Sequence, residues 1–92
     1  MDNIIITVKD EQGSFFYDME IPSTVPMKPV IEQLIGNLSL LDPAYPFYRK
    51  KWVFICSRTN QKIAYDNTAQ ECGIWNGDYL IMKEEQHGAD HL

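Results

Sequence analysis

Only one stretch of this chain carries the spacing of an amphipathic helix, and prolines separate it from the residues before it. Pro22, Pro26 and Pro29 forbid an extended strand from continuing through this region. Because proline is tolerated in the first turn of a helix, where its missing N–H would be unpaired anyway, a helix is predicted to begin between Pro26 and Pro29. It should run for about three turns and end near Gly36-Asn37. Its apolar side consists of Val30, Ile31, Leu34, Ile35 and Leu38.

Five other segments carry the period of two, or the β-branched and aromatic composition, that is typical of strands. Polar turn residues around Gly13 join the first two into a predicted hairpin. A packed loop, residues 39–51, follows the helix, and the turn signal Asn76-Gly77 precedes the last strand. The predicted strands are residues 3–9, 15–21, 52–56, 62–65 and 79–83.

This order of elements predicts an α+β domain of the β-grasp, ubiquitin-like type. The helical connection allows the first and last strands to pair in parallel at the centre, through the right-handed crossover that such connections prefer. One helix is long enough to cover one face of a mixed four- to five-stranded sheet. With 92 residues there is room for one core. We expect residues 1–83 to form this domain and residues 84–92 to form a polar, loosely ordered tail.

Charge and composition exclude several classes of function. The net charge of −5 argues against a general nucleic-acid binder. The longest apolar run, Ile4-Ile5-Ile6, is far shorter than a membrane-spanning helix, and the N-terminus lacks the basic start of a signal peptide, so we expect a cytoplasmic protein without membrane insertion. Residues 49–65 contain five cations and no acid. These cations either form a polarised surface for a partner or simply solvate a loop and a strand edge.

The segment Glu71–Leu80, with its Gly-Ile-x-Asn-Gly-Asp sequence, resembles the closing motif of the YukD/EsaB family of small bacterial ubiquitin-like proteins. The similarity extends from about Ile4 to Met82, although Pro29 and the loop Asp42–Tyr48 depart from the family pattern. This resemblance implies a non-enzymatic, cytoplasmic accessory component of the type VII secretion system of Gram-positive bacteria, with partners in the secretion machinery. The other matching positions are Gly13, Ser14, Pro26, Lys28, Val30, Ile31 and Trp52.

Two other classes of function remain as alternatives. Ubiquitin and the sulfur-carrier β-grasp proteins end in Gly-Gly, whereas this chain ends Ala89-Asp90-His91-Leu92, so we expect no conjugation through its C-terminus. A modifier or carrier is therefore the disfavoured alternative. The third interpretation is a structural subunit whose apolar surface is covered in a homo-oligomer; otherwise we expect a monomer or a weak homo-oligomer.

The alternation of side chains predicts an apolar patch on the face of the sheet opposite the helix. Soluble monomers seldom expose contiguous apolar surface beyond a few hundred Å², so such a patch indicates a protein-docking site. Its predicted members are Ile5, Trp52, Phe54, Tyr79 and Ile81. The residues predicted to face the helix are Ile4, Ile6, Val8, Val53, Ile55, Leu80 and Met82.

A basic rim is predicted beside this patch, because Arg49, Lys50 and Lys51 immediately precede Trp52. Cations at the rim of an interface chiefly speed the encounter with an acidic partner. The alternative is that the loop Asp42–Tyr48 or the C-terminal tail folds over the patch and covers it.

No pattern in the sequence indicates catalysis, a cofactor or a metal. Cys56 and Cys72 lack C-x-x-C spacing, so we expect free, buried thiols, with a disulfide between them left open. His87 and His91 lie in a polar tail without a third ligand. Trp75 begins a W-x-G sequence like that of the small helical substrates of type VII systems, but a strand follows it, so we interpret Trp75 as a packing or surface residue at a turn.

Overall fold

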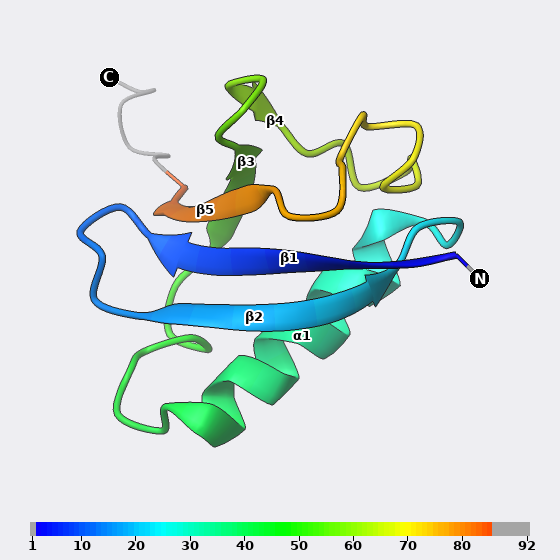
Figure 1. Cartoon of the computed structure of the whole chain (residues 1–92). Coiled ribbons are helices and arrows are strands. Elements are labelled where there is room, and N and C mark those ends of the chain that lie inside the picture. The colour runs from blue at the N-terminus through cyan, green and yellow to red at the C-terminus, as the bar shows by residue number, and fades with distance from the viewer. Residues whose placement is uncertain (1, 86–92) are drawn as a thin grey trace, which may run out of the picture.

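The computed structural model describes residues 2–85, and its elements follow one another in the predicted order (Figure 1). The fourth strand is shorter than predicted, and the last extends one residue beyond the predicted end of the domain. The remainder of the predicted tail, with His87 and His91, lies outside the described residues. The elements are β1 (Asn3–Asp10), β2 (Phe16–Pro22), α1 (Met27–Leu41), β3 (Trp52–Cys56), β4 (Gln61–Lys62) and β5 (Tyr79–Glu84).

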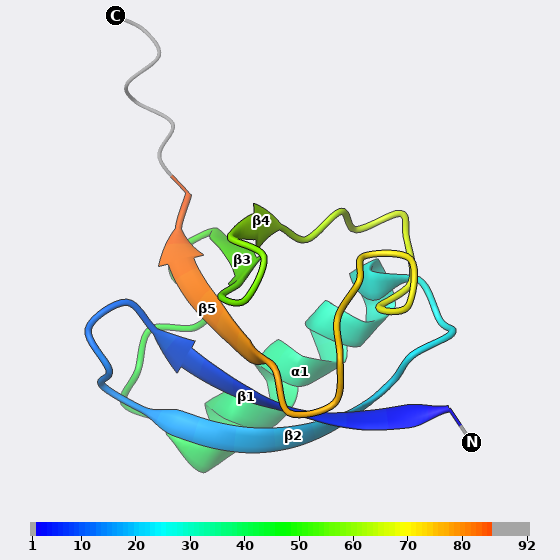
Figure 2. The same cartoon turned by 45° about the horizontal axis from the view of Figure 1, so that its top comes forward.

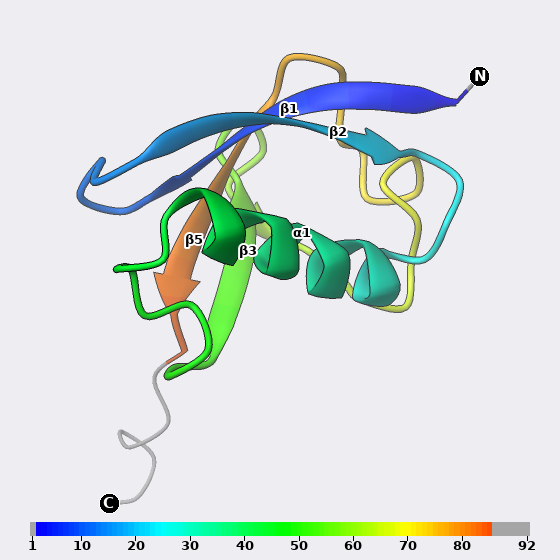
Figure 3. The same ribbon diagram turned by 90° about the horizontal axis from the view of Figure 1, so that it is seen from below.

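The strands form one five-stranded mixed sheet in the order β2-β1-β5-β3-β4. β1 and β5 pair in parallel at its centre, as predicted, and the other neighbouring strands are antiparallel (Figure 2). A parallel pair needs a crossover connection, and α1 lies within that connection, packed across one face of the sheet (Figure 3).

The hydrophobic core fills the space between the sheet and α1. Burial of these aliphatic side chains drives the helix against the sheet, at about 2 kcal/mol for each fully buried side chain. The predicted apolar side of the helix is confirmed, although Ile35 is only half-buried. Its buried residues are Met27, Val30, Ile31, Leu34 and Leu38, and they face Ile6, Val8, Leu80 and Met82 of the central strands.

The helix begins at Met27, inside the predicted window, but it does not end near Gly36-Asn37 as predicted. It continues to Leu41, and its last turn closes where the Asp42 N–H donates to the Leu38 carbonyl oxygen at 2.9 Å. A glycine inside a helix costs about 1 kcal/mol relative to alanine. Burial of Leu38, which is fully inaccessible to solvent, outweighs that cost and keeps the helix intact.

The loop after α1 packs against the core, as predicted, through a cluster of aromatic rings. Phe47 is buried, and Tyr45 contacts both Phe47 and Phe15, with ring centroids 4.7 and 5.0 Å away. The Tyr45 hydroxyl donates a 2.8 Å hydrogen bond to Asp10 Oδ2 at the end of β1. This bond fixes the loop to the hairpin between β1 and β2.

Asp10 is almost fully buried, and its carboxylate oxygens accept hydrogen bonds from several donors. Burial alone would raise the pKa of its carboxyl, but hydrogen bonds from Ser14 and Tyr45 outweigh that effect and lower the pKa. Burial and the same bond raise the pKa of the Tyr45 hydroxyl. Asp10 is therefore held as a carboxylate at neutral pH by these local donors.

The sequence also predicts free, buried thiols and no membrane insertion. Cys56 is buried, Cys72 is half-buried, and both are free thiols. In the part of the chain that the structure describes, no helix has both the length and the hydrophobicity to cross a membrane.

Replacing Tyr45 with phenylalanine should destabilise the domain, because it removes one donor from a buried carboxylate while keeping the aromatic ring. We expect a loss of about 2 kcal/mol in the free energy of unfolding, measured by urea denaturation. Tyr48→Phe is the matched control, since Tyr48 is 73% exposed, and it should change stability by less than about 0.5 kcal/mol. Equal effects of the two substitutions would contradict this assignment.

Candidate functional site: the outer face of the sheet

The face of the sheet that α1 does not cover, called the outer face here, carries every second residue of each strand. The register places them in rows: Ile55 of β3 lies opposite Ile81 of β5, which lies beside Lys9 of β1. Thr7 lies beside Tyr79 in the same way. The outer-face residues are Ile5, Thr7, Lys9, Phe16, Asp18, Glu20, Val53, Ile55, Lys62, Tyr79, Ile81 and Lys83.

Apolar side chains are prominent on this face. Phe16 is 55% exposed, Ile5 51% and Tyr79 45%, while Val53, Ile55 and Ile81 are half-buried. The structure thus places Ile5, Tyr79 and Ile81 on the predicted side of the sheet. It adds Phe16 of β2, which was not among the predicted members of the patch.

The predicted orientation of β3 was wrong. Phe54 is only 1% exposed and Trp52 packs against the core, so both face α1, whereas Val53 and Ile55 face outward. Every residue of Trp52–Cys56 is apolar, so alternation could not decide which set faces in. The antiparallel register with β5 decides it, because it sets Phe54 opposite the buried Met82.

Trp52 also explains where the loop after α1 lies. Its indole Nε1 donates a 2.9 Å hydrogen bond to the carbonyl oxygen of Phe47, and the ring contacts Tyr45. The loop therefore covers Trp52 on the helix side of the sheet and does not lie over the outer face (Figure 3).

One member of the predicted basic rim, Lys50, lies on the helix side of the sheet. Lys50 forms an ion pair with Glu84 at 3.4 Å and lines a hollow of about 280 Å³ on the helix side, together with Ile35 and Trp52. Arg49 and Lys51 are exposed. The prediction that Lys50 borders the apolar patch is therefore wrong, and the role of Arg49 and Lys51 stays a prediction.

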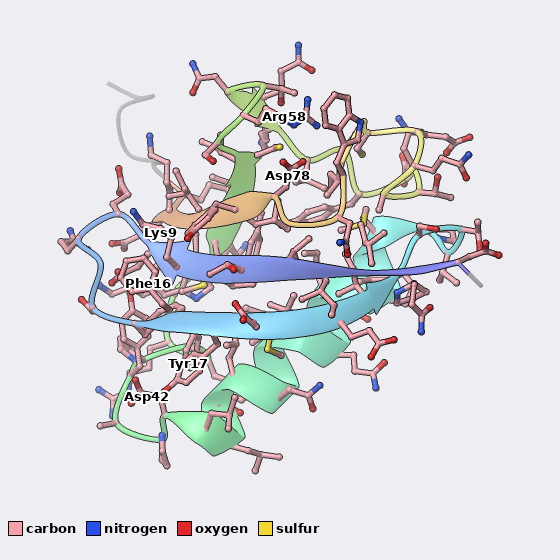
Figure 4. The ribbon with its side chains drawn as sticks, in the orientation of Figure 1. Lys9, Phe16, Tyr17, Asp42, Arg58 and Asp78 are labelled. Atoms are coloured by element: carbon pink, nitrogen blue, oxygen red, sulfur yellow. The ribbon has the colours of Figure 1, made fainter. Side chains whose placement is uncertain are left out.

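Other cations border the outer face instead. Lys9 lies 5.2 Å from the centre of the Phe16 ring on the neighbouring strand (Figure 4). Lys83 Nζ is 3.6 Å from Glu11 Oε2. Lys9, Lys83 and the apolar pair Ile55 and Ile81 line a shallow hollow of about 250 Å³. The sequence offered a signal for these lysines, because the alternation that exposes Ile5 also exposes them.

A polar network holds the turn that leads into β5. Asp78 is nearly buried and accepts hydrogen bonds from Arg58 Nε at 3.0 Å and from the Trp75 N–H at 2.8 Å (Figure 4). Arg58 also donates to the Gly73 carbonyl oxygen and stacks on the Trp75 ring, 3.6 Å from its centre. Sequence reasoning missed this pair, because Arg58 and Asp78 lie 20 residues apart.

The same turn is fixed to β1. Asn76 Oδ1 accepts a 2.7 Å hydrogen bond from the Ile5 N–H, and the Gly77 N–H donates to the Ile5 carbonyl oxygen at 2.7 Å. Gly77 has a φ of 91°, a conformation that favours glycine, as the Asn-Gly turn signal predicted. Ile5 and Tyr79 are thus presented on a rigid framework.

Among residues 2–85, no group of three or more His, Cys, Asp or Glu side chains is placed to hold a metal ion. What the arrangement offers is apolar surface bordered by charge, the composition of a protein interface.

No family model matches the sequence, and no curated protein is significantly similar to it. Solved structures do match. The ubiquitin-like domain of the Mycobacterium tuberculosis type VII secretion system protein EccD1 gives a TM-score of 0.69 at 22% identity, over 90% of this chain and 99% of that chain. The EccD5 ubiquitin-like domain from Mycobacterium xenopi gives 0.74 at 12% identity, over 95% and 99%. The fold is ubiquitin-like.

The β-grasp fold class predicted from the sequence is therefore confirmed. A chain of the MycP5-free ESX-5 inner membrane complex contains a similar domain, with a TM-score of 0.64 at 14% identity, covering 95% of this chain and 22% of that chain. At such identities the shared property is the fold. Because one fold supports many functions, the function of this ubiquitin-like domain has to be argued from its surface.

The orientation of β3 can be tested with a pair of lysine substitutions. Phe54→Lys should strongly destabilise the domain, because a cavity and an unpaired charge in the core cost at least about 4 kcal/mol of a total stability of roughly 5–15 kcal/mol. Ile5→Lys, on the outer face, should change stability by less than about 1 kcal/mol. Circular dichroism melting curves would distinguish them, and a Phe54→Lys protein that melts near the wild-type temperature would contradict the assignment.

The Asp78 network should make stability depend on pH. Hydrogen bonds from Arg58 lower the pKa of the Asp78 carboxyl, against burial, which acts in the opposite direction. A lowered pKa means that the carboxylate stabilises the fold above its ordinary pKa of 3.8, and that this stability is lost as the pH falls toward the lowered value. Urea midpoints of wild type and Asp78→Asn should therefore differ at pH 7 and converge below about pH 4.

The control for this titration is Asp66→Asn, which removes an exposed carboxylate from the loop before β5. It should follow the wild-type curve at both pH values. A difference between wild type and Asp78→Asn that stays constant from pH 7 to pH 3 would show that the carboxylate charge contributes nothing.

Proposed function

We propose that this protein is a non-enzymatic, ubiquitin-like adaptor or regulatory component of a type VII secretion system of Gram-positive bacteria. It acts in the cytoplasm by binding proteins of the secretion machinery through the outer face of its sheet. The single observation that carries the binding role is the exposure of Ile5, Phe16 and Tyr79 on a rigid face that the described chain leaves uncovered.

The choice of pathway rests on two independent likenesses. The segment Glu71–Leu80 resembles the closing motif of the YukD/EsaB family. Two of the structurally similar domains come from type VII secretion proteins, EccD1 and EccD5, and a third belongs to an ESX-5 inner membrane complex. The Asn76-Gly77 turn of the motif supports Ile5 directly through its hydrogen bonds, which links the family resemblance to the proposed surface.

The chemistry of the outer face favours a partner that brings both apolar and charged groups. Tyr79 and Phe16 supply large aromatic area, which is typical of the residues that dominate binding energy at interfaces. Lys9 and Lys83 lie beside them and would speed encounter with an acidic surface. Arg49 and Lys51 remain predicted contributors, to be substituted in the same assay.

The proposal is tested by a double substitution, Ile5→Lys with Tyr79→Lys, in a tagged protein produced at its native level. We expect the variant to melt near the wild-type temperature, to stop co-purifying with the secretion-system membrane proteins, and to alter secretion of their substrates. Leu40→Lys is the matched control, because Leu40 is 80% exposed at the end of α1. Unchanged co-purification and secretion in the folded double variant would refute the proposal.

A further inference from the structure

One edge of the sheet is open and the other is closed. Along β3, β4 pairs only with Ile55 and Cys56, but the residues after β4 also bond to β3. The Ile63 N–H donates to the Phe54 carbonyl oxygen at 2.8 Å, and the Tyr65 hydroxyl donates to the Trp52 carbonyl oxygen at 3.2 Å. At the opposite edge, β2 pairs with β1 alone, and no described segment lies along its other side (Figures 1 and 2).

The backbone groups that face this open edge can be identified. The Thr7 N–H donates to Asp78 and the Ile5 carbonyl accepts from Gly77, so the odd-numbered residues of β1 bond toward the β5 side. Because backbone groups alternate in direction along a strand, the even-numbered residues of β1 bond β2. Their partners are Tyr17, Met19 and Ile21, and the N–H and C=O groups of Phe16, Asp18 and Glu20 therefore point away from the sheet.

A groove runs beside this edge on the helix side. Between β2 and α1 lies a hollow of about 170 Å³ with an aliphatic floor, enough for one or two small side chains. Gln33 and Asn37 of α1 and Glu20 of β2 provide polar groups at its border. The floor consists of Met19, Ile21, Val30 and Leu34.

The outer side of the same edge is acidic. Asp18 and Glu20 are exposed, and each accepts one hydrogen bond from a neutral group of β1, from Thr7 Oγ1 at 2.7 Å and from Asn3 Nδ2 at 3.0 Å. Within residues 2–85, neither carboxylate takes part in an ion pair. Two copies joined along β2 would bring these like charges together, which disfavours self-association at this edge.

We propose that the β2 edge is a docking site for an extended segment of another protein, which adds a strand to the sheet. The segment carries basic residues at alternate positions, facing Asp18 and Glu20, and small aliphatic residues at the intervening positions, entering the groove between β2 and α1. Main-chain hydrogen bonds supply the affinity in this mode of recognition, and the alternate side chains supply the specificity. This site lies at the β2 margin of the outer face, away from Tyr79, and does not depend on the proposed pathway.

The test begins with selection of random 12-residue peptides displayed on phage against the full chain. Enriched peptides should alternate Lys or Arg with Val, Ile or Ala. A synthetic peptide of the enriched sequence should then shift the amide resonances of β2 and slow hydrogen exchange at Asp18 and Glu20 by at least about tenfold at saturation. No enrichment, or enrichment without this pattern, would overturn the proposal.

Three controls separate the edge from other surfaces. Asp18→Asn with Glu20→Gln should weaken the peptide about tenfold in 50 mM salt, and by less at high salt, because charge pairs are screened. Methylation of alternate peptide nitrogens, which removes the peptide's donors without touching the protein, should abolish binding. Tyr79→Ala, on the outer face but separated from β2 by β1, should leave binding unchanged; loss of binding in this variant would place the peptide over Tyr79 and refute the edge site.

Self-association is measured on the same samples. Sedimentation equilibrium should give a monomer mass for the wild type over the concentration range used for the peptide. A dimer that the double substitution of Asp18 and Glu20 strengthens would show that a second copy occupies the edge, and would replace the proposal.

Discussion

The parallel pairing of β1 with β5 dictates the remainder of the architecture. Two parallel strands cannot be joined by a tight turn, so the chain between Asp10 and Tyr79 must include a segment that crosses the sheet. That connection supplies α1, and the helix buries the inner side chains of the central strands, Val8 and Leu80 among them. Because the one helix covers only one face, the other remains available for binding.

Two buried carboxylates stabilise the connections at opposite ends of this central pair. Asp10, at the end of β1, fixes the loop after α1 through Tyr45, and Asp78, just before β5, fixes its turn through Arg58. Both carboxyl groups have lowered pKa values because donors surround them. The loops are therefore ordered by specific polar contacts as well as by apolar packing, and the rigidity of the outer face derives in part from Asp78.

Much of this fold could be predicted from local pattern, and the exceptions have physical causes. The sequence predicted correctly which face of β1 points outward, because Asn3, Thr7 and Lys9, on the same face as Ile5, are polar. β3 offers no polar residue, so only its pairing with β5 fixes which side Phe54 takes. The length of α1 depended on the burial of Leu38.

Contacts across long separations in sequence set a second limit on prediction. The Tyr45–Asp10 bond joins residues 35 positions apart, and the Arg58–Asp78 pair spans 20 positions. No pattern within a short window indicates either pair. The open edge of β2 likewise follows from the order of the strands in the sheet. The residues of β2 themselves have the pattern of an ordinary strand with one solvent-exposed face.

The parallel pair also determines how the domain would respond to force. The start of β1 and the end of β5 lie at opposite ends of the pair, since both strands run in one direction. Tension applied between them loads the inter-strand hydrogen bonds in shear, all together, instead of opening them one by one. A domain held at these two points between moving parts of a larger assembly would transmit a pull rather than unravel under it.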